Sequence, residues 1–251
     1  MSEIINSVWI GNELGPVHAA CLRSFVRHGY DVVLHCYESP VDLPDGVRLF
    51  DAAKLMPREQ IFRNKRTGSL AMAADIYRYR MQREGMGLYV DCDVYCVRPV
   101  KFTDYMFGWE MQGSINNAVL KLPQNSELLA LMLEAADDSY FIPLWYSPAK
   151  YGFQQLRKRL GLPRHVSHCR LETLGPSLLT YMVNKLELAH QAQAIDIYSP
   201  LHLGHTPLLF EPALHLNDLI TPRTQLIHLY NSALKGKEIP AQCPLRDILN
   251  H

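Results

Sequence analysis

Apolar and polar positions along the first part of the chain follow patterns that predict strands and helices in turn. Residues 4–10 form an apolar run that ends at Gly11 and predicts a buried first strand. Helical spacing of apolar positions over residues 16–28 stops at Gly29, which is typical of a helix end. Residues 32–37 are rich in β-branched and aromatic side chains and predict a second strand. This alternation favours an α/β fold with a mixed, mostly parallel sheet flanked by helices.

The later part of the chain continues the pattern less regularly. Helices are predicted over residues 69–84, 126–136 and 175–186. Strands are predicted over residues 88–90, 106–111, 118–122, 195–198 and 225–230. Residues 141–175 contain three prolines and clustered polar positions, so we expect an insertion or a subdomain there. The sequence contains neither an internal repeat nor a Ser/Gly-rich linker, which favours a single domain over residues 1–251.

Composition narrows the classes of protein that the chain can belong to. Apolar residues make up 48% and charged residues 20% of the chain, values typical of a globular protein with a full core. Lys+Arg and Asp+Glu both number 25, so the basic excess of a nucleic-acid-binding domain is missing and we expect no nucleic-acid partner. No run reaches the roughly 18 to 20 apolar residues needed to cross a bilayer, so no transmembrane segment is expected.

The N-terminus and the cysteines bear on localisation. The first six residues have neither a basic region nor a long apolar region, which predicts no signal peptide. The six cysteines are scattered, and the close pair Cys92 and Cys96 lacks a second pair to complete a zinc site. We therefore expect reduced thiols and a cytoplasmic protein.

The run LYVDCD at residues 88–93 is the most informative stretch for chemistry. It places two carboxylates, Asp91 and Asp93, where a hydrophobic strand leaves the core, and open α/β sheets bind ligands at that edge. A regular strand would point both carboxylates to the same side, because its side chains repeat every second residue. Two oxygen ligands on one side suit Mg²⁺ or Mn²⁺. The alternative is an acidic turn that faces solvent.

The predicted helix before this run carries a second charged pair. Asp75 and Arg78 are three residues apart and share a helical face with Ala71 and Ala74, which are small enough for a ligand to approach closely. Such a pair is often a surface ion pair worth under about 1 kcal/mol. Because this helix leads directly into the acidic strand end, both pairs can instead converge on one cleft.

These motifs together resemble the nucleotide-sugar signature of glycosyltransferase family 32, which is related to the catalytic core of the large clostridial glucosylating toxins. The resemblance rests on Asp75-x-x-Arg78, a Gly-containing turn and the run at 88–93, preceded by Trp-Ile-Gly at residues 9–11. It continues more loosely at residues 115–117, at 175–176 and at His228-x-x-x-Ser232. The chain departs from the family in having Gly-Met-Gly at residues 85–87 for Gly-Gly, and Ala233 for Trp.

The resemblance implies a role for each matching residue at the donor. It implies that Trp9 stacks on the uracil ring while the neighbouring Val8 and Gly11 line the base site; the alternative for Trp9 is an ordinary core position. It implies that Asp75, Arg78 and Asn117 are the catalytic residues that hold the donor sugar and diphosphate.

The resemblance also implies a metal site with Mn²⁺ or Mg²⁺ as cofactor. Asp91 and Asp93 would hold the ion, and Tyr89 and Asp91 would line the ribose pocket. His228 either completes the metal shell or ends a buried strand, and Ser232 would contact the diphosphate.

The function implied is a retaining glycosyltransferase with a GT-A-like, Rossmann-like fold. It would move a hexose from a UDP-sugar donor to a saccharide or glycolipid acceptor, in the synthesis of bacterial capsule, lipopolysaccharide or another surface glycan. The nucleotide-sugar-binding part would be about residues 1–125 and the acceptor side about residues 126–251. Two alternatives remain, namely a nucleotide-sugar- or carbohydrate-binding module with weak catalysis, and a metal-dependent nucleotidyl or phosphoryl transferase, which would need a glycine-rich phosphate loop.

A basic stretch at residues 157–165 contains Arg157, Lys158, Arg159 and Arg164. It predicts either an ordinary charged helix face or a surface that attracts a phosphate-containing acceptor or an anionic membrane. The second interpretation implies peripheral membrane contact.

Overall fold

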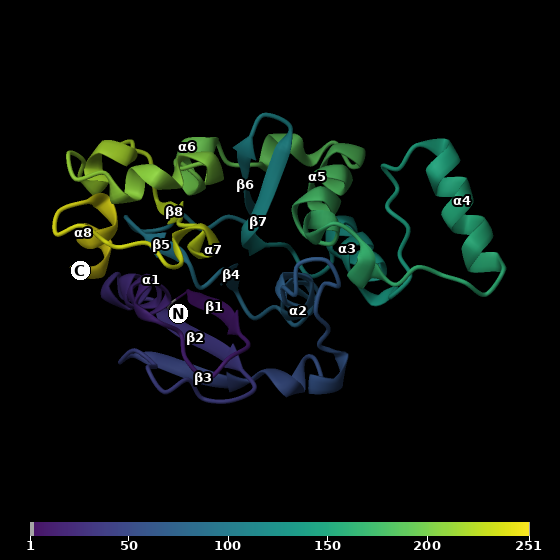
Figure 1. The fold of residues 1–251 in the computed structure, drawn as a ribbon, viewed down its shortest axis with the longest axis horizontal. Coiled ribbons are helices and arrows are strands. Elements are labelled where there is room, and N and C mark those ends of the chain that lie inside the picture. Colours follow the sequence, from purple (N-terminus) through teal and green to yellow (C-terminus); the bar gives the residue numbers. More distant parts are fainter. Residues whose placement is uncertain (1–2, 251) are drawn as a thin grey trace.

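A six-stranded sheet forms the centre of the molecule in the computed structural model, which describes residues 3–250 (Figure 1). Its strand order is β3-β2-β1-β4-β7-β6. The six strands are β1 (Ile4–Trp9), β2 (Asp31–Cys36), β3 (Val47–Asp51), β4 (Leu88–Val90), β6 (Met106–Met111) and β7 (Ser114–Lys121). A second, two-stranded sheet pairs β5 (Val94–Cys96) with β8 (Leu226–His228) in antiparallel orientation.

The first four strands are parallel, and their order contains a switch in direction. From β1 the chain moves to β2 and then β3 on one side, and it crosses back to place β4 on the other side of β1. Neighbouring crossovers therefore lie on opposite faces, and a crevice opens where the carboxyl ends of β1 and β4 meet. Strand β7 then pairs with β4 in antiparallel orientation.

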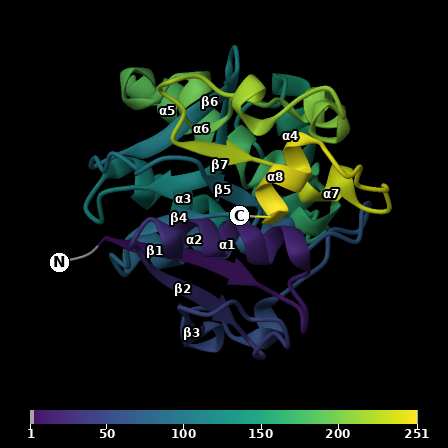
Figure 2. The ribbon, with the colours of Figure 1, turned by 90° about the vertical axis from the view of Figure 1, so that its left-hand side faces the viewer.

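Helices cover both faces of the sheet. On one face lie α2 (Ala71–Arg83), α3 (Glu127–Asp137) and α5 (Pro176–Lys185), which share a core with alternate sheet residues such as Tyr89 and Leu120. On the other face α1 (Pro16–Arg27) buries Leu22 and Phe25 against Leu88. The C-terminal helix α8 (Pro244–Asn250) packs on α1, as Figure 2 shows. This two-faced cover explains why the central strands β1, β2 and β4 are buried at nearly every position.

The observed elements confirm most of the predicted helices and strands, but the prediction of a strand over residues 195–198 is wrong. This segment is a short helix, α6 (Ile195–Tyr198), in which the Ser199 amide donates to the Ile195 carbonyl at 2.8 Å. Only Gln193, just before it, pairs with the edge strand β6. Four residues are too few for periodicity to separate a strand from a helical turn.

The segment from 141 to 175, expected to be an insertion or an acceptor-facing subdomain, carries helix α4 (Pro148–Arg159) between irregular stretches. A short helix, α7 (Asn231–Leu234), follows β8. Within residues 3–250, no helix combines the length and the apolar character that a membrane crossing requires.

Candidate functional site

The predicted site residues gather where β1 and β4 end side by side at the switch in strand order. The Ser7 hydroxyl donates to the Val90 carbonyl at 2.7 Å, and the Cys92 thiol contacts the Val8 carbonyl at 3.5 Å. These bonds tie the end of β4 to β1, so the segments after Trp9 and Val90 leave the sheet at the same edge. Ligand-binding residues of open α/β sheets occupy this position.

Asp91 and Asp93 lie in a tight turn between β4 and β5 and not on a continuing strand. The Val94 amide donates to the Asp91 carbonyl at 3.0 Å and closes the turn. The expectation that a regular strand aligns the two carboxylates is therefore wrong, yet the turn still brings them together. One ligand atom from each of Asp91, Asp93 and His228 lies within 4.8 Å of the other two.

His228 joins this cluster through the pairing of β8 with β5. His228 lies opposite Val94, and its Nε2 is 3.3 Å from the Asp93 carboxylate. Burial by itself would raise the pKa of Asp93, but His228, the Asn231 amide and His18 together lower it below its usual range. Asp93 is therefore an anion in the folded protein at neutral pH.

The chemistry of this cluster fits a divalent metal. Two carboxylates and one imidazole are ligands that Mn²⁺ accepts, and the carboxylates alone also suit Mg²⁺. The His228 nitrogen that faces the carboxylates is Nε2, 3.3 Å from Asp93, so Nε2 is the atom that could bind an ion there. Asp91, Asp93 and His228 are the residues that would hold the ion.

Asp75 lies close to this cluster in a buried polar network. Its side chain is buried on α2, where it accepts a hydrogen bond from the Asn117 amide at 2.8 Å and lies 3.4 Å from Arg78. Burial raises the pKa of Asp75 to about 6, and the Arg78 charge and the Asn117 bond offset only part of that effect. Gly175 at the start of α5 packs against this carboxylate, since a Cβ there would lie 2.7 Å from Asp75 Oδ2.

Arg78 connects Asp75 with the acidic turn. Its guanidinium donates to Asp91 at 2.9 Å and to the Asn117 carbonyl, and it stacks on the Tyr89 ring at 4.4 Å. The Tyr89 hydroxyl donates to the same Asp91 oxygen at 2.8 Å. Arg78 and Tyr89 are both almost fully buried, so they orient Asp91 from the side of the core.

Trp9 lies at the end of β1 with its ring half-buried. Its indole nitrogen donates to the Glu13 carbonyl at 3.1 Å, and the ring lies 4.5 Å from the His18 ring. A Cβ at Gly11 would come within 3.0 Å of the indole nitrogen, so glycine leaves room for this ring position. Val8, one residue earlier, is buried in the core.

The segment after β8 adds residues for which the sequence holds no signal. Tyr230 has φ 51°, a left-handed conformation that non-glycine residues adopt mainly where surrounding structure enforces it. The bend directs the Asn231 amide to Asp93 at 2.8 Å, and the Asn231 side chain contacts His18 at 3.0 Å. Ser232 follows as an exposed residue on α7. Neither His18 nor Asn231 belongs to a recognisable motif, so sequence reasoning missed both.

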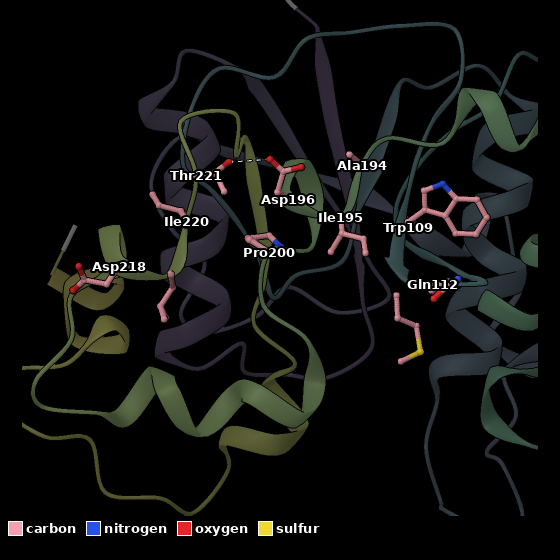
Figure 3. Close-up of a pocket in the computed structure, with 11 residues that line it drawn as sticks. Trp109, Gln112, Ala194, Ile195, Asp196, Pro200, Asp218, Ile220 and Thr221 are labelled. Carbon is pink, nitrogen blue, oxygen red and sulfur yellow. Dashed lines mark hydrogen bonds between the residues drawn. The ribbon is translucent and has the colours of Figure 1, made fainter.

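Two cavities open beside the β6–β7 hairpin, and Met111 near its tip lines both. One has a volume of about 640 Å³, and in Figure 3 Trp109 and Ile195 border it, together with Asp196, which accepts a hydrogen bond from Thr221. The other, of about 1160 Å³, is lined by Glu172 and Thr173 just before Gly175, and therefore lies near Asp75. None of the predicted site residues lines either cavity, although all of them lie within the described part of the chain.

Comparison with known proteins identifies the architecture. No protein-family model matches the sequence, and neither does any curated protein. Among solved structures, the chain resembles the ligand-free glycosyltransferase domain from the YGT toxin, with a TM-score of 0.53 and 11% identity over 82% of each chain. It also resembles the PaToxG glycosyltransferase, with a TM-score of 0.47 and 15% identity over 76% of this chain and 72% of that chain. The fold is GT-A-like, as the YGT toxin domain shows.

Proposed function

We propose that this chain is a metal-dependent glycosyltransferase that moves a hexose from a UDP-sugar to a saccharide or glycolipid acceptor. The observation that carries the proposal is the meeting of Asp91, Asp93 and His228 at the switch point of a GT-A-like sheet. Bacterial capsule, lipopolysaccharide or other surface-glycan synthesis is the process in which we expect the reaction.

The residues around the acidic turn suit the binding of a nucleotide diphosphate sugar. Trp9 offers a partly exposed aromatic ring for the uracil, with Val8 and Gly11 beside it. Asp75 and Asn117 would bind hydroxyls of the donor sugar. Ser232 is exposed next to Asn231 and would contact the diphosphate.

Arg78 and Tyr89 contribute to the site by orienting the Asp91 carboxylate. Both donate to the Asp91 carboxylate, so we assign them as residues that position it. Mn²⁺ or Mg²⁺ bound by Asp91, Asp93 and His228 would act as a Lewis acid that neutralises charge on the diphosphate.

The reaction that we propose retains the configuration of the sugar. The bond from the anomeric carbon to the UDP phosphate oxygen breaks, and the acceptor hydroxyl forms its bond on the same face. The hydroxyl proton passes to the leaving phosphate, so the protein mainly holds the reactants in position.

The test measures release and transfer of sugar from a panel of UDP-sugars with and without Mn²⁺. We expect Asp93→Asn to abolish turnover, because it removes a charged metal ligand at nearly constant size, and Asp91→Asn to weaken both donor binding and metal activation. The exposed Asp45→Asn is the matched control and should keep wild-type rates. Near wild-type rates in both site variants would contradict the metal assignment, and donor binding without release would favour a binding module.

A further inference from the structure

Helix α4 projects from the rest of the molecule. Figure 1 shows it at one end of the long axis, joined to the body by two extended segments. Gln154 is its only buried residue, and Lys158 pairs with Asp138 at 2.8 Å, so the helix contacts the body along one side and leaves most of its residues exposed.

The outer face of α4 is apolar and exposed. Phe153, Leu156 and Leu160 are 58%, 54% and 67% exposed, and Leu162 just beyond the helix is 64% exposed. At about 100° per residue, Phe153, Leu156 and the C-cap Leu160 fall within an arc of about 60° that lies about 100° to 160° from the buried Gln154. Large side chains in such a stripe are rarely left to water without a binding partner.

The stretch of sequence that carries this stripe has only positive formal charges, and one of them, Lys158, is paired with Asp138 at 2.8 Å. Residues 139–171 contain no Asp or Glu, in a chain whose net charge is zero. Its six cations are Lys150, Arg157, Lys158, Arg159, Arg164 and Arg170. By helical position, Lys150 and Arg157 flank the apolar stripe on one side and Arg159 flanks it on the other.

We propose that α4 inserts the stripe of Phe153, Leu156 and Leu160 into the surface of an anionic lipid bilayer. An interfacial helix buries its apolar side chains among the acyl chains while flanking cations contact anionic headgroups. The stripe lies on the exposed side of a helix at one end of the molecule, a position from which it can reach a planar surface. A second copy of this chain is a poor occupant, because a symmetric contact would bring the cations of both copies together.

A bilayer bound at α4 would lie close to the proposed glycosyltransferase site. Trp145 and Ser147 just before α4, and Lys150 in its first turn, line the cavity of about 1160 Å³, which Glu172 and Thr173 border near Asp75. A membrane under α4 would therefore present a glycolipid acceptor next to this cavity. This consequence rests on the proposed function, whereas bilayer binding itself does not.

The experiment measures binding of the full chain to vesicles by flotation. Vesicles of phosphatidylcholine with one third phosphatidylglycerol are compared with pure phosphatidylcholine. We expect at least tenfold tighter binding to the anionic vesicles, with loss of affinity from about 0.1 M to about 0.5 M salt. Arg157→Gln with Arg159→Gln should weaken binding about 25-fold, or about fivefold for each charge.

The apolar stripe is tested with Phe153→Gln, Leu156→Gln and Leu160→Gln in one variant, which should bind anionic vesicles at least tenfold more weakly. The control replaces three exposed apolar residues elsewhere, Val41, Leu203 and Leu208, with Gln and should bind like the wild type. Unchanged thermal unfolding and UDP-sugar hydrolysis in vesicle-free buffer show that fold and site survive. Equal binding to neutral vesicles, equal binding by the stripe variant and the control, or α4-dependent dimers without vesicle binding would each overturn the proposal.

Discussion

Asp75 is a nearly fully buried carboxyl group whose pKa is raised to about 6, mainly by burial. In the unfolded chain the pKa returns to about 4. The folded state therefore binds the proton more tightly, and the contribution of Asp75 to stability is lost as the pH rises from about 4 to about 6. At neutral pH this charged side chain destabilises the fold, as is typical of residues kept for function.

Asp75→Asn should therefore raise the stability of the fold and lower the activity. Asparagine can still accept the hydrogen bond from Asn117 without a buried charge, so we expect the free energy of unfolding at pH 7 to rise by about 2 kcal/mol. Sugar release should fall strongly, and the gain in stability should vanish near pH 4. Denaturant unfolding at both pH values measures this, and a variant less stable at pH 7 would contradict the burial argument.

Substitution of Trp9 tests whether its ring stacks on the uracil base of the donor. Trp9→Ala should weaken UDP binding by roughly 1 to 3 kcal/mol, the range for base stacking on aromatic side chains. The ring is half-buried at the end of β1, so the fold should persist. Calorimetric titration with UDP gives the affinity, and thermal unfolding is the control. Unchanged affinity with lowered stability would assign Trp9 to the core instead.

At the scale of elements, Gly87 sets how closely β4 approaches β1. It has φ 110°, and a Cβ at this position would lie 2.6 Å from the Ile4 carbonyl oxygen. The residue lies in the Gly-Met-Gly turn between α2 and β4, directly before the strand that carries Asp91 to the sheet edge. Both the backbone conformation and the packing therefore require glycine.

Gly87→Ala should destabilise the fold by more than the cost of placing alanine at a positive φ. Gly113 is the matched control, because it has φ 80° and a Cβ there would meet no atom within 4 Å. We expect Gly113→Ala to cost about 1 kcal/mol and Gly87→Ala about 2 kcal/mol or more, since strand β4 must shift. Urea unfolding of the two variants gives the comparison, and equal losses would exclude the close approach as the cause.

At the scale of the whole molecule, His35 ties the sheet to α2. Its ring contacts Asn6 on β1 at 2.9 Å and Tyr77 on α2 at 2.8 Å, and burial lowers its pKa to about 4. The unfolded chain, with a pKa near 6.5, binds the proton more readily between these values. His35 therefore stabilises the fold above about pH 6.5, and this stability is lost as the pH falls toward 4.

Acidification should destabilise the whole molecule through His35. We expect the free energy of unfolding to fall by up to about 3 kcal/mol between pH 7 and pH 4 on account of this residue. His35→Gln should remove that part of the pH dependence, while the exposed His190→Gln should leave it unchanged. Unfolding curves at several pH values provide the measurement. If the pH dependence of the free energy of unfolding is the same in His35→Gln and the wild type, groups other than His35 cause it.

Elements with a local signal could be predicted from the amino-acid sequence. The apolar run of β1, the helical spacing of α1 and α2 and the strand before Asp91 could all be predicted, because side-chain periodicity reflects burial on one face or both. The alternation of these elements also predicted the parallel α/β sheet. Short segments such as α6 lay beyond this reasoning, since four residues cannot display a period.

Which distant residues meet at the acidic turn depends on how the whole chain packs. The bond from Asn231 to Asp93 joins residues 138 positions apart, and the pairing of β8 with β5 places His228 beside the same carboxylate. Arg78 likewise meets Asp91 because α2 packs on β4. Such contacts depend on strand pairing and helix packing across the whole chain. A local sequence pattern contains no information about them, so Asn231 was missed, and the meeting of His228 with Asp91 and Asp93 was expected only from the family resemblance.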